Sequence, residues 1–398
     1  MIWFDAHLDL ACLAVHGRDM TAPPERATKP WPPAAVTLPS LNTGGVAFAL
    51  ATIFIEQVNA DTPASSLGPE QYRAGDIDGA ARRGRAQLEV YETWRDRGLI
   101  KLDLPRCLKT DSGVGEIRGG MGVSEVVPTP IAARALRLAE NGPHFGILVE
   151  GADSIRSPDD LEWWKSRGVC AVGLAWAKSS RYAQGNMGEV ITGCTEREGL
   201  SALGREMIRA IDAHRLVHDL SHLSDRACDE MLTLTDRPVM ASHSNGRELL
   251  GGDLNGKNQR HLRDGTIFEI ARRGGVIGLN LFEKFLRPAP AHAAQPALAA
   301  TNAGGQPTPA RPSHPPTIDH ALDHVEHVCA VAGHKRAVGL GSDMDGGFSA
   351  AQMCDGIERP EHLSRLAAGL RARNWSEDEI DGFTHLNWLR FWERQGAF

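Results

Sequence analysis

The sequence lacks the long apolar runs and paired cysteines that define several common protein classes. None of its 398 residues belongs to an uninterrupted run of about 18 apolar residues, which a membrane-spanning helix requires. Its seven cysteines are scattered and form no C-x-x-C pair, which argues against a zinc ribbon or a disulfide scaffold and favours a reducing compartment. No basic region followed by an apolar stretch is present at the start, so we expect a cytoplasmic protein without a signal peptide.

Clustered positive charge and a glycine-rich nucleotide motif are also missing. The formal net charge is −7, and no long run of lysine and arginine occurs, so a nucleic-acid partner is not expected. The first apolar run is followed by no G-x-G-x-x-G turn, which disfavours a doubly wound dinucleotide-binding sheet. The remaining composition, with 42% hydrophobic and 23% charged residues, is typical of a globular domain.

What the sequence does contain is an alternation of strand-like and helix-like segments. Apolar runs of strand length recur eight times, at residues 2–10, 46–55, 145–150, 169–176, 216–221, 239–242, 276–281 and 337–341. Helical spacing of apolar residues occurs between them, at residues 131–140, 202–214, 225–233, 266–273 and 318–332. This alternation predicts an α/β fold, a (β/α)8 TIM-type barrel that forms a single domain over residues 1–398. The Pro/Ala-rich residues 286–316 predict an inserted loop after the seventh strand, because so many prolines exclude a regular helix.

Polar side chains suited to metal binding follow five of the eight predicted strands. The active sites of β/α barrels lie at the carboxyl ends of their strands. In this sequence those ends carry His7, Asp9, Glu150, His222, His243 and Asp343. A lone residue of this kind is usually structural, but five strand ends with metal-ligand or acid–base groups make coincidence a poor explanation.

The residue types predict two metal ions. Imidazole nitrogens and carboxylate oxygens are zinc-type ligands, and side chains two apart on a strand, such as His7 and Asp9, share one face. Glu150 has two oxygens and can bridge two ions, and His222 and His243 can complete the second ion's ligands. A hydroxide shared by the ions would attack the substrate carbonyl. Asp343 is placed to collect the proton and pass it to the departing amine.

The motifs carrying these residues resemble the membrane (renal) dipeptidase family of the amidohydrolase superfamily. The segments DAHLDL, LVEG, DLSH, SHSN, GSDMDGG and the C-terminal HLNWLRFWE occur in the family's order, from about Asp5 to Trp392. The resemblance implies a β/α barrel with two zinc ions that hydrolyses dipeptides. It implies metal ligands at His7, Asp9, Glu150, His222 and His243, and an acid–base aspartate at Asp343. It also implies an arginine for the substrate carboxylate, best matched by Arg260.

Two positions depart from the family pattern. Trp176, at the end of the fourth predicted strand, stands where the family typically has a substrate-contacting histidine, and Phe282 stands where the renal enzyme has a tyrosine. Both changes make the expected pocket more apolar, and Trp176 is expected to line it. The expected partner is a small dipeptide-like molecule, with a homodimer as a further option and no membrane partner. A cyclic amide, a lactam or an N-acyl amino acid remains an alternative substrate, and a non-catalytic metal-binding barrel is a third reading.

Overall fold

The computed structural model describes residues 1–108, 130–191, 194–195, 197–252, 259–288, 298–301, 307–309 and 315–395. Seven of its strands form one sheet in the order β7-β6-β5-β2-β1-β11-β8, and all neighbouring strands run parallel. They are β1 (Trp3–Leu8), β2 (Val46–Phe54), β5 (His144–Glu150), β6 (Val169–Gly173), β7 (Val217–Asp219), β8 (Ile277–Leu279) and β11 (Val338–Leu340). Every residue of β1 and β5 is buried, as the near-continuous apolar runs predicted. The α/β class with a curled parallel sheet is therefore confirmed.

A short segment around Met240 lies between the two edge strands of this sheet. Met240 pairs with Asp219, the last residue of β7, and Ala241 pairs with Ile277 of β8, both as isolated parallel bridges. The predicted strand at 239–242 is thus reduced to two bridges, because each of these residues pairs with a different neighbour. Gly278 and Gly341 make room for this segment, since a Cβ built on either would overlap the carbonyl oxygen of Ser242.

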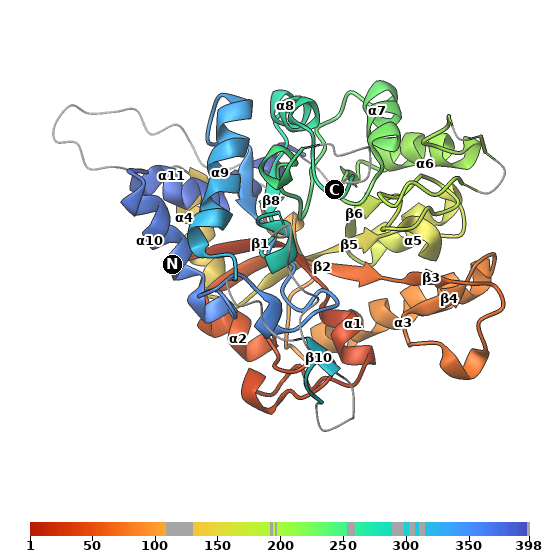
Figure 1. Ribbon diagram of the computed structural model, residues 1–398, viewed down its shortest axis with the longest axis horizontal. Coiled ribbons are helices and arrows are strands. Elements are labelled where there is room, and N and C mark those ends of the chain that lie inside the picture. The colour runs from red at the N-terminus through yellow and green to blue at the C-terminus, as the bar shows by residue number, and fades with distance from the viewer. Residues whose placement is uncertain are drawn as a thin grey trace.

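Helices surround the strands (Figure 1). They are α1 (Leu10–Val15), α2 (Leu38–Thr43), α3 (Ile77–Asp96), α4 (Pro130–Ala139), α5 (Leu161–Ser166), α6 (Ala202–Ala213), α7 (Asp225–Leu234), α8 (Asp264–Arg272), α9 (Ile318–Ala332), α10 (Ser364–Ala372), α11 (Glu377–Asp381) and α12 (Asn387–Arg394). Several begin at a side chain that accepts from a backbone N–H of the first turn, such as Ser201 before α6 and Ser224 before α7. In the described part of the chain, no helix is both long and apolar enough to span a bilayer.

An aromatic cluster fills the amino ends of the central strands. Phe4 of β1 stacks on Phe48 of β2 and on Trp388 of α12, and the indole N–H of Trp388 donates to the carbonyl of Leu340 at 3.0 Å. Because α12 packs against this end, the carboxyl ends of the strands are the ones left for a site.

The structure corrects the predicted extent of several elements. β6 ends at Gly173, so Trp176 lies three residues beyond the strand rather than at its end. Beyond the strand, the Leu174 carbonyl accepts from the Ser180 hydroxyl at 2.7 Å and from the backbone N–H of Ala152 at 3.4 Å. Two short strands that pair with each other, β3 (Glu56–Val58) and β4 (Gln71–Arg73), were not expected.

Within 286–316 the structure describes two strands, β9 (Leu298–Thr301) and β10 (Pro307–Pro309), which pair antiparallel. A 3-10 turn, η7 (Glu283–Phe285), ends just before this segment. The remainder of the predicted insertion, at 289–297, 302–306 and 310–314, lies outside the described residues. All seven cysteines are free.

Candidate metal centre

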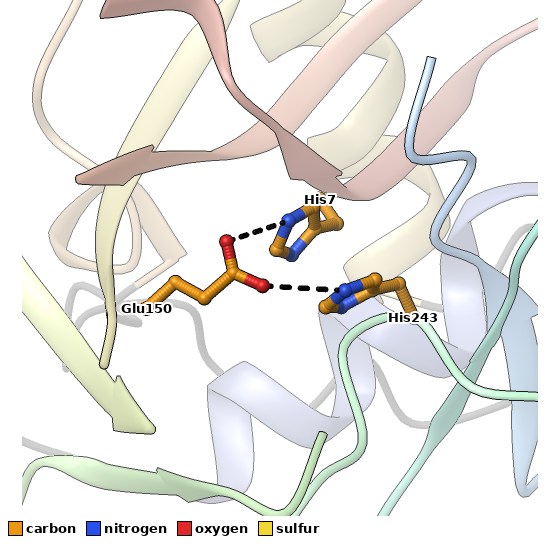
Figure 2. Close-up of side chains that lie close together, drawn as sticks. All are labelled: His7, Glu150 and His243. Carbon is orange, nitrogen blue, oxygen red and sulfur yellow. Dashed lines mark ion pairs between the residues drawn. The ribbon is translucent and has the colours of Figure 1, made fainter. Parts of the chain in front are cut away.

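Glu150, the last residue of β5, lies among three histidines at the carboxyl ends of the strands. Its Oε2 is 3.4 Å from Nε2 of His7, and its Oε1 is 3.0 Å from Nε2 of His222 and 3.4 Å from Nε2 of His243. Figure 2 shows the carboxylate between His7 and His243, with one oxygen turned toward each. The two oxygens of Glu150 therefore face two separate sets of ligand atoms.

Asp9 and Asp343 complete the side facing His7. Asp9 directly follows β1 and is the N-cap residue of α1, and its Oδ1 lies 3.8 Å from Nε2 of His7 while accepting the hydroxyl hydrogen of Thr52. Ligand atoms of His7, Asp9 and Asp343 lie within 4.8 Å of one another, and so do those of His7, Glu150 and His243. Each trio could hold a metal ion.

His222 lies in the turn beyond β7, and its left-handed backbone, with a φ of 67°, aims the ring back at Glu150. Asn186 fixes this ring, since its Oδ1 is 3.0 Å from Nδ1 of His222. His243 follows the bridged residues 240–241, and its ring stacks on that of His7 with 3.5 Å between the centroids. The structure thus brings all five sequence-predicted ligands together.

The charges in this buried cluster are unbalanced without a cation. Burial alone would lower the pKa of His7, but the facing carboxylates, Glu150 first, raise it to about 10. Burial, and then the positive charge of Arg260, lowers the pKa of His222 to about 4. Burial, and then the charge of Glu150, raises the pKa of Asp9 to about 6. A protonated His7 therefore supplies a positive charge among several carboxylates. A bound metal ion could supply this charge instead.

The donor set fits a metal ion. Nε2 of His7 is buried and has no hydrogen-bond partner, although it points at Glu150 and Asp9. An unpaired buried nitrogen of this kind is costly unless it binds something. Histidine nitrogens with carboxylate oxygens are the ligands that zinc prefers. Asp9, Glu150, His7, His222 and His243 are all at most 8% exposed, so an ion there would be largely shielded from water.

Asp343 lies beside His7 and Asp9 and has the properties of a group able to exchange a proton. It follows β11 with a φ of 59°, and its Oδ2 accepts from the Asn280 side-chain N–H at 2.8 Å. Burial raises its pKa to about 7, with the charge of His7 acting in the opposite direction. A carboxyl group that titrates near neutrality suits general acid–base chemistry.

Arg260 lies at the edge of the centre. Its guanidinium donates to the carbonyl of His243 at 2.8 Å and to the Ser244 hydroxyl at 3.2 Å, and it lies 5.1 Å from the ring centre of Phe285. Its Nε is buried and has no hydrogen-bond partner. The positive charge acts on Asp343 and Glu150, which places it beside the metal-ligand cluster. The preceding residues 253–258 lie outside the described residues.

An aromatic wall borders the same centre. The ring of Trp176 lies 5.9 Å from that of His222 and meets Phe54, at the end of β2, edge-on at 5.0 Å. Phe282, which follows β8, stacks on Phe348 at 4.2 Å and is only partly buried. Trp176 therefore reaches the centre from a loop, although the strand was expected to carry it there.

Buried histidines and carboxylates at the carboxyl ends of a curled parallel sheet define the class, an α/β protein with a metal-binding centre of the hydrolase type. The chain belongs to the membrane dipeptidase family (peptidase family M19), whose sequence profile matches residues 131–397. Family membership implies a metal cofactor.

Curated relatives match part of the chain. An uncharacterised dipeptidase of Schizosaccharomyces pombe is 30% identical over 205 residues, which cover 51% of this chain and 42% of that protein. Dipeptidase tcpJ of Claviceps purpurea is 26% identical over 223 residues, which cover 56% of this chain and 44% of that protein. The matches thus span less than half the length of these two relatives.

Solved structures match the whole fold. The metallopeptidase dipeptidase AC has a TM-score of 0.70 at 21% identity, with 100% of this chain and 99% of that one covered. A metallopeptidase from Rhodobacter sphaeroides, bound to a phosphinate mimic of the dipeptide L-Ala-D-Ala, has a TM-score of 0.69 at 20% identity, with 99% of both chains covered. At these identities the likeness establishes the fold.

Four residues of the centre were not singled out from the sequence. Thr52 and Asn280 contact the carboxylates, and Ser242 and Asn186 contact the histidines. Ser242 and Asn280 fall at or beside predicted strand ends, so the rule that found the ligands could have included them. Asn186 lies in a long loop, where sequence spacing gives no such signal.

Proposed function

We propose that this protein is a binuclear zinc-dependent hydrolase that cleaves the amide bond of a dipeptide or a dipeptide-like substrate with a free carboxylate. The observation that carries the proposal is that the two oxygens of Glu150 face different ligands. Its Oε2 faces His7, and its Oε1 faces His222 and His243. A carboxylate placed in this way can bridge two positions, one held by His7 and Asp9 and the other by His222 and His243. The proposal includes a full eight-stranded barrel, supported by the bridges that Met240 and Ala241 make to both edge strands.

Two zinc ions, when bound, supply polarisation of the scissile carbonyl and activation of water at neutral pH. The chain's own residues supply the proton transfer. Asp343 takes a proton from the attacking water and returns it to the nitrogen of the departing amine, so the carboxyl group ends as it began. Asn280 holds one oxygen of Asp343 and leaves the other for this exchange.

Arg260 would orient the substrate through its carboxylate. A guanidinium offers a planar pair of donors that matches a carboxylate. Its bonds to the His243 carbonyl and the Ser244 hydroxyl, together with the Phe285 ring, fix the side chain beside the centre. A substrate held there would have its amide bond brought toward Glu150 and Asp343.

The first experiment measures metal content and hydrolysis together. Zinc-loaded protein should contain about two equivalents per chain and release amino acids from a panel of dipeptides. The variant Arg260→Lys should raise KM for dipeptides more than it lowers kcat. The matched control is Arg273→Lys, because Arg273 also donates to main-chain carbonyls but follows α8, before β8 begins. Absence of hydrolysis with every substrate of the panel, despite two bound zinc ions, would reject the proposal.

A second candidate substrate class is favoured by the aromatic wall. Trp176 and Phe54 place apolar surface beside His222, where a polar residue could otherwise meet the substrate. An N-acyl amino acid has a free carboxylate and an apolar acyl group, and its amide bond is chemically the same. The panel should therefore include N-acyl amino acids, and faster turnover of these than of dipeptides would select this class.

A further inference from the structure

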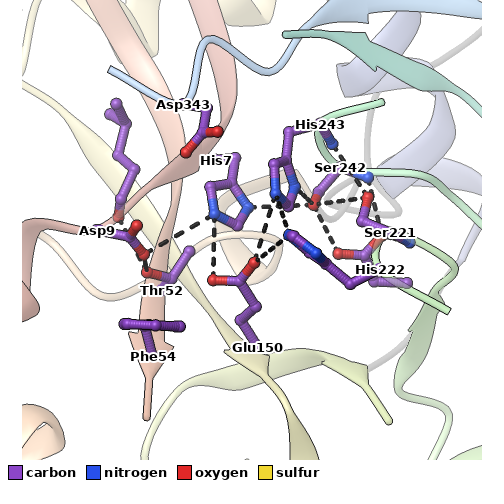
Figure 3. Close-up of polar contacts among 12 residues, drawn as sticks. His7, Asp9, Thr52, Phe54, Glu150, Ser221, His222, Ser242, His243 and Asp343 are labelled. Atoms are coloured by element: carbon purple, nitrogen blue, oxygen red, sulfur yellow. Dashed lines mark hydrogen bonds and ion pairs between the residues drawn. The ribbon is translucent and has the colours of Figure 1, made fainter. Parts of the chain in front are cut away.

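A single buried hydroxyl lies between two of the histidines of the centre. The Oγ of Ser242 is 3.1 Å from Nδ1 of His7 and 2.8 Å from Nδ1 of His243 (Figure 3). It is also 2.6 Å from Oδ2 of Asp219, at the end of β7. Ser242 is fully buried, and its hydroxyl has one further, longer contact among the described residues, to the Ser221 hydroxyl at 3.4 Å.

The direction of each hydrogen bond follows from counting donors. Asp219 can only accept, and its Oδ1 already receives the backbone N–H groups of Ser221 at 3.0 Å and Ser242 at 2.8 Å. The single hydrogen of the Ser242 hydroxyl therefore goes to Oδ2 of Asp219, the shortest of its contacts. The serine oxygen is then left with lone pairs only, so both Nδ1 atoms must carry hydrogen and donate to it.

This assignment fixes the opposite nitrogen of each ring. A neutral histidine with hydrogen on Nδ1 has a free lone pair on Nε2, and Nε2 is the atom that both rings turn toward Glu150. The bond to the far nitrogen of a ligand histidine is known to set its tautomer and ring orientation. Here one hydroxyl does so for two rings at once.

We infer that the Asp219–Ser242 pair is a shared positioning device, which sets the tautomer of one histidine ligand at each of the two metal positions. The inference rests on the proposed function, since His7 belongs to one position and His243 to the other. Ser242 is thus a positioning residue whose loss should weaken both ions together. The third histidine is independent of it, because Nδ1 of His222 meets Oδ1 of Asn186 instead.

The chain offers a matched control for this pair. Asp5, on β1, accepts the backbone N–H and the hydroxyl hydrogen of Ser342, as Asp219 does from Ser242. Ser342 is equally buried and also follows a strand of the sheet. Its oxygen meets the backbone N–H of Met344 at 3.3 Å and is bonded to no histidine in the described part of the chain. Ser342→Ala therefore removes the same kind of buried bond without touching a ligand.

The test is a zinc titration against a chromophoric chelator that resolves both binding steps. Ser242→Ala should weaken both steps by about 10–100-fold, the usual effect of removing a partner behind a metal ligand. Asn186→Ala should weaken only one step, and Ser342→Ala should weaken neither. Unfolding curves of the metal-free variants confirm that each is folded.

Asp219→Asn provides a second variant that keeps the shape of the side chain. With its amide oxygen on the two backbone N–H groups, its NH2 group faces Ser242 and donates to the hydroxyl oxygen. The hydroxyl hydrogen must then turn to one histidine, which forces that ring into the wrong tautomer. We expect at least one zinc step to weaken about 10–100-fold although Ser242 is unchanged.

A spectroscopic readout separates positioning from simple packing. In zinc-loaded parent protein with 15N-labelled histidine, the Nδ1–H protons of His7 and His243 should be shifted downfield and exchange slowly. In Ser242→Ala both signals should move upfield and exchange faster, while the His222 signal stays in place. Unchanged His7 and His243 signals would contradict the inference.

The possible outcomes distinguish the inference from the proposed function. A parent protein that lacks two zinc-binding steps would reject the proposed function. A two-step parent in which Ser242→Ala keeps both affinities, or loses only one, would overturn the shared role alone. Equal weakening by Ser342→Ala would likewise overturn it, because the effect would then be general.

Discussion

Two groups of buried carboxylates lie in or just after strands of the same sheet, and the protein bonds them differently. The supporting carboxylates, Asp5 and Asp219, each accept two backbone N–H groups and one serine hydroxyl. The open carboxylates, Asp9, Glu150 and Asp343, have few such donors. Thr52 bonds Asp9 and Asn280 bonds Asp343, and among the described residues Glu150 meets only histidine nitrogens.

The comparison shows that burial and residue type do not distinguish a structural acid from a functional one. All five carboxylates are at most 7% exposed. The difference is the supply of donors, because a buried carboxylate that is not bonded by the protein retains its need for a cation or a proton. The supporting carboxylates thus receive three hydrogen bonds each and are held rigidly. The open carboxylates receive fewer and remain able to bind a cation or a proton.

The largest effect is expected when an open carboxylate can no longer bridge. Glu150→Gln should bind fewer than two zinc ions and lose at least about 10⁴-fold in kcat/KM, which corresponds to about 5.5 kcal/mol of transition-state stabilisation. Metal analysis and initial rates test this. Two tightly bound zinc ions in the variant would show that Glu150 does not bridge. Glu150 would then no longer be an example of an open carboxylate that needs a cation.

Asp343→Asn should separate proton transfer from metal binding. Among the open carboxylates, Asp343 is the one proposed to transfer the proton. The variant should therefore keep both ions, and its kcat should fall about 10²–10⁴-fold. Metal content and kcat are measured on the same preparation. A rate close to that of the parent would show that Asp343 does not transfer the proton and has a structural role, like Asp5 and Asp219.

The third prediction concerns the pH dependence of stability, which should depend on a buried histidine that forms no ion pair with a carboxylate in the described part of the chain. His324 of α9 is 1% exposed, and in the described part of the chain the one hydrogen bond of its ring is to the Leu286 carbonyl, at 3.2 Å. Burial lowers its pKa to about 4, in contrast to His7. The unfolded chain therefore binds more protons between pH 6.5 and about 4, and stability present at pH 7 is lost as the pH falls. The loss attributable to this group is about 3 kcal/mol.

His324→Gln should flatten that acid-side loss in urea unfolding curves of metal-free protein at pH 7 and pH 4. His334→Gln is the matched control, because it makes the same substitution at a histidine that is partly exposed rather than buried. An unchanged slope in His324→Gln would show that burial without a carboxylate does not control this titration.

The smallest effect concerns the aromatic wall beside the open carboxylates. Trp176→His should shift the ratio of kcat/KM for small dipeptides to that for aromatic ones by about tenfold toward the small ones, or about 1.4 kcal/mol. The indole face contributes apolar contact, and an imidazole could bond a substrate oxygen instead. Trp163→His is a control, since Trp163 packs between Arg85 and Arg167. Equal kcat/KM ratios in the parent and the Trp176 variant would show that Trp176 does not line the substrate pocket.

Most of the sheet could be predicted because buried parallel strands have continuous apolar sequences. Seven of the eight predicted runs form strands, and only 239–242 is reduced to bridges. The pair β3 and β4 was missed because each strand has three residues and is mainly polar, so it has no apolar pattern. The extent of β6 was overestimated because Leu174 and Ala175 are apolar and buried yet lie outside the ladder.

The five candidate ligands could be predicted because a curled parallel sheet brings distant strand ends to one place. His7 and His243 are 236 positions apart in the chain, yet their rings stack. The supporting residues could not be assigned in the same way. Which of several serines meets a ring nitrogen depends on left-handed turns, such as those at His222 and Asp343, and on the exact approach of neighbouring segments.

Gly278 and Gly341 show how a residue with no functional group can appear indispensable in a mutational scan. Any side chain at either position would collide with the carbonyl oxygen of Ser242. The segment carrying the serine would have to move, and its hydroxyl would leave the two imidazoles that it joins. Inherited variation at these glycines should therefore be as rare as variation at the candidate ligands, although a glycine has no side chain that could bind a metal ion. A survey of tolerated substitutions would group them with the active site, and the reason would be lack of space.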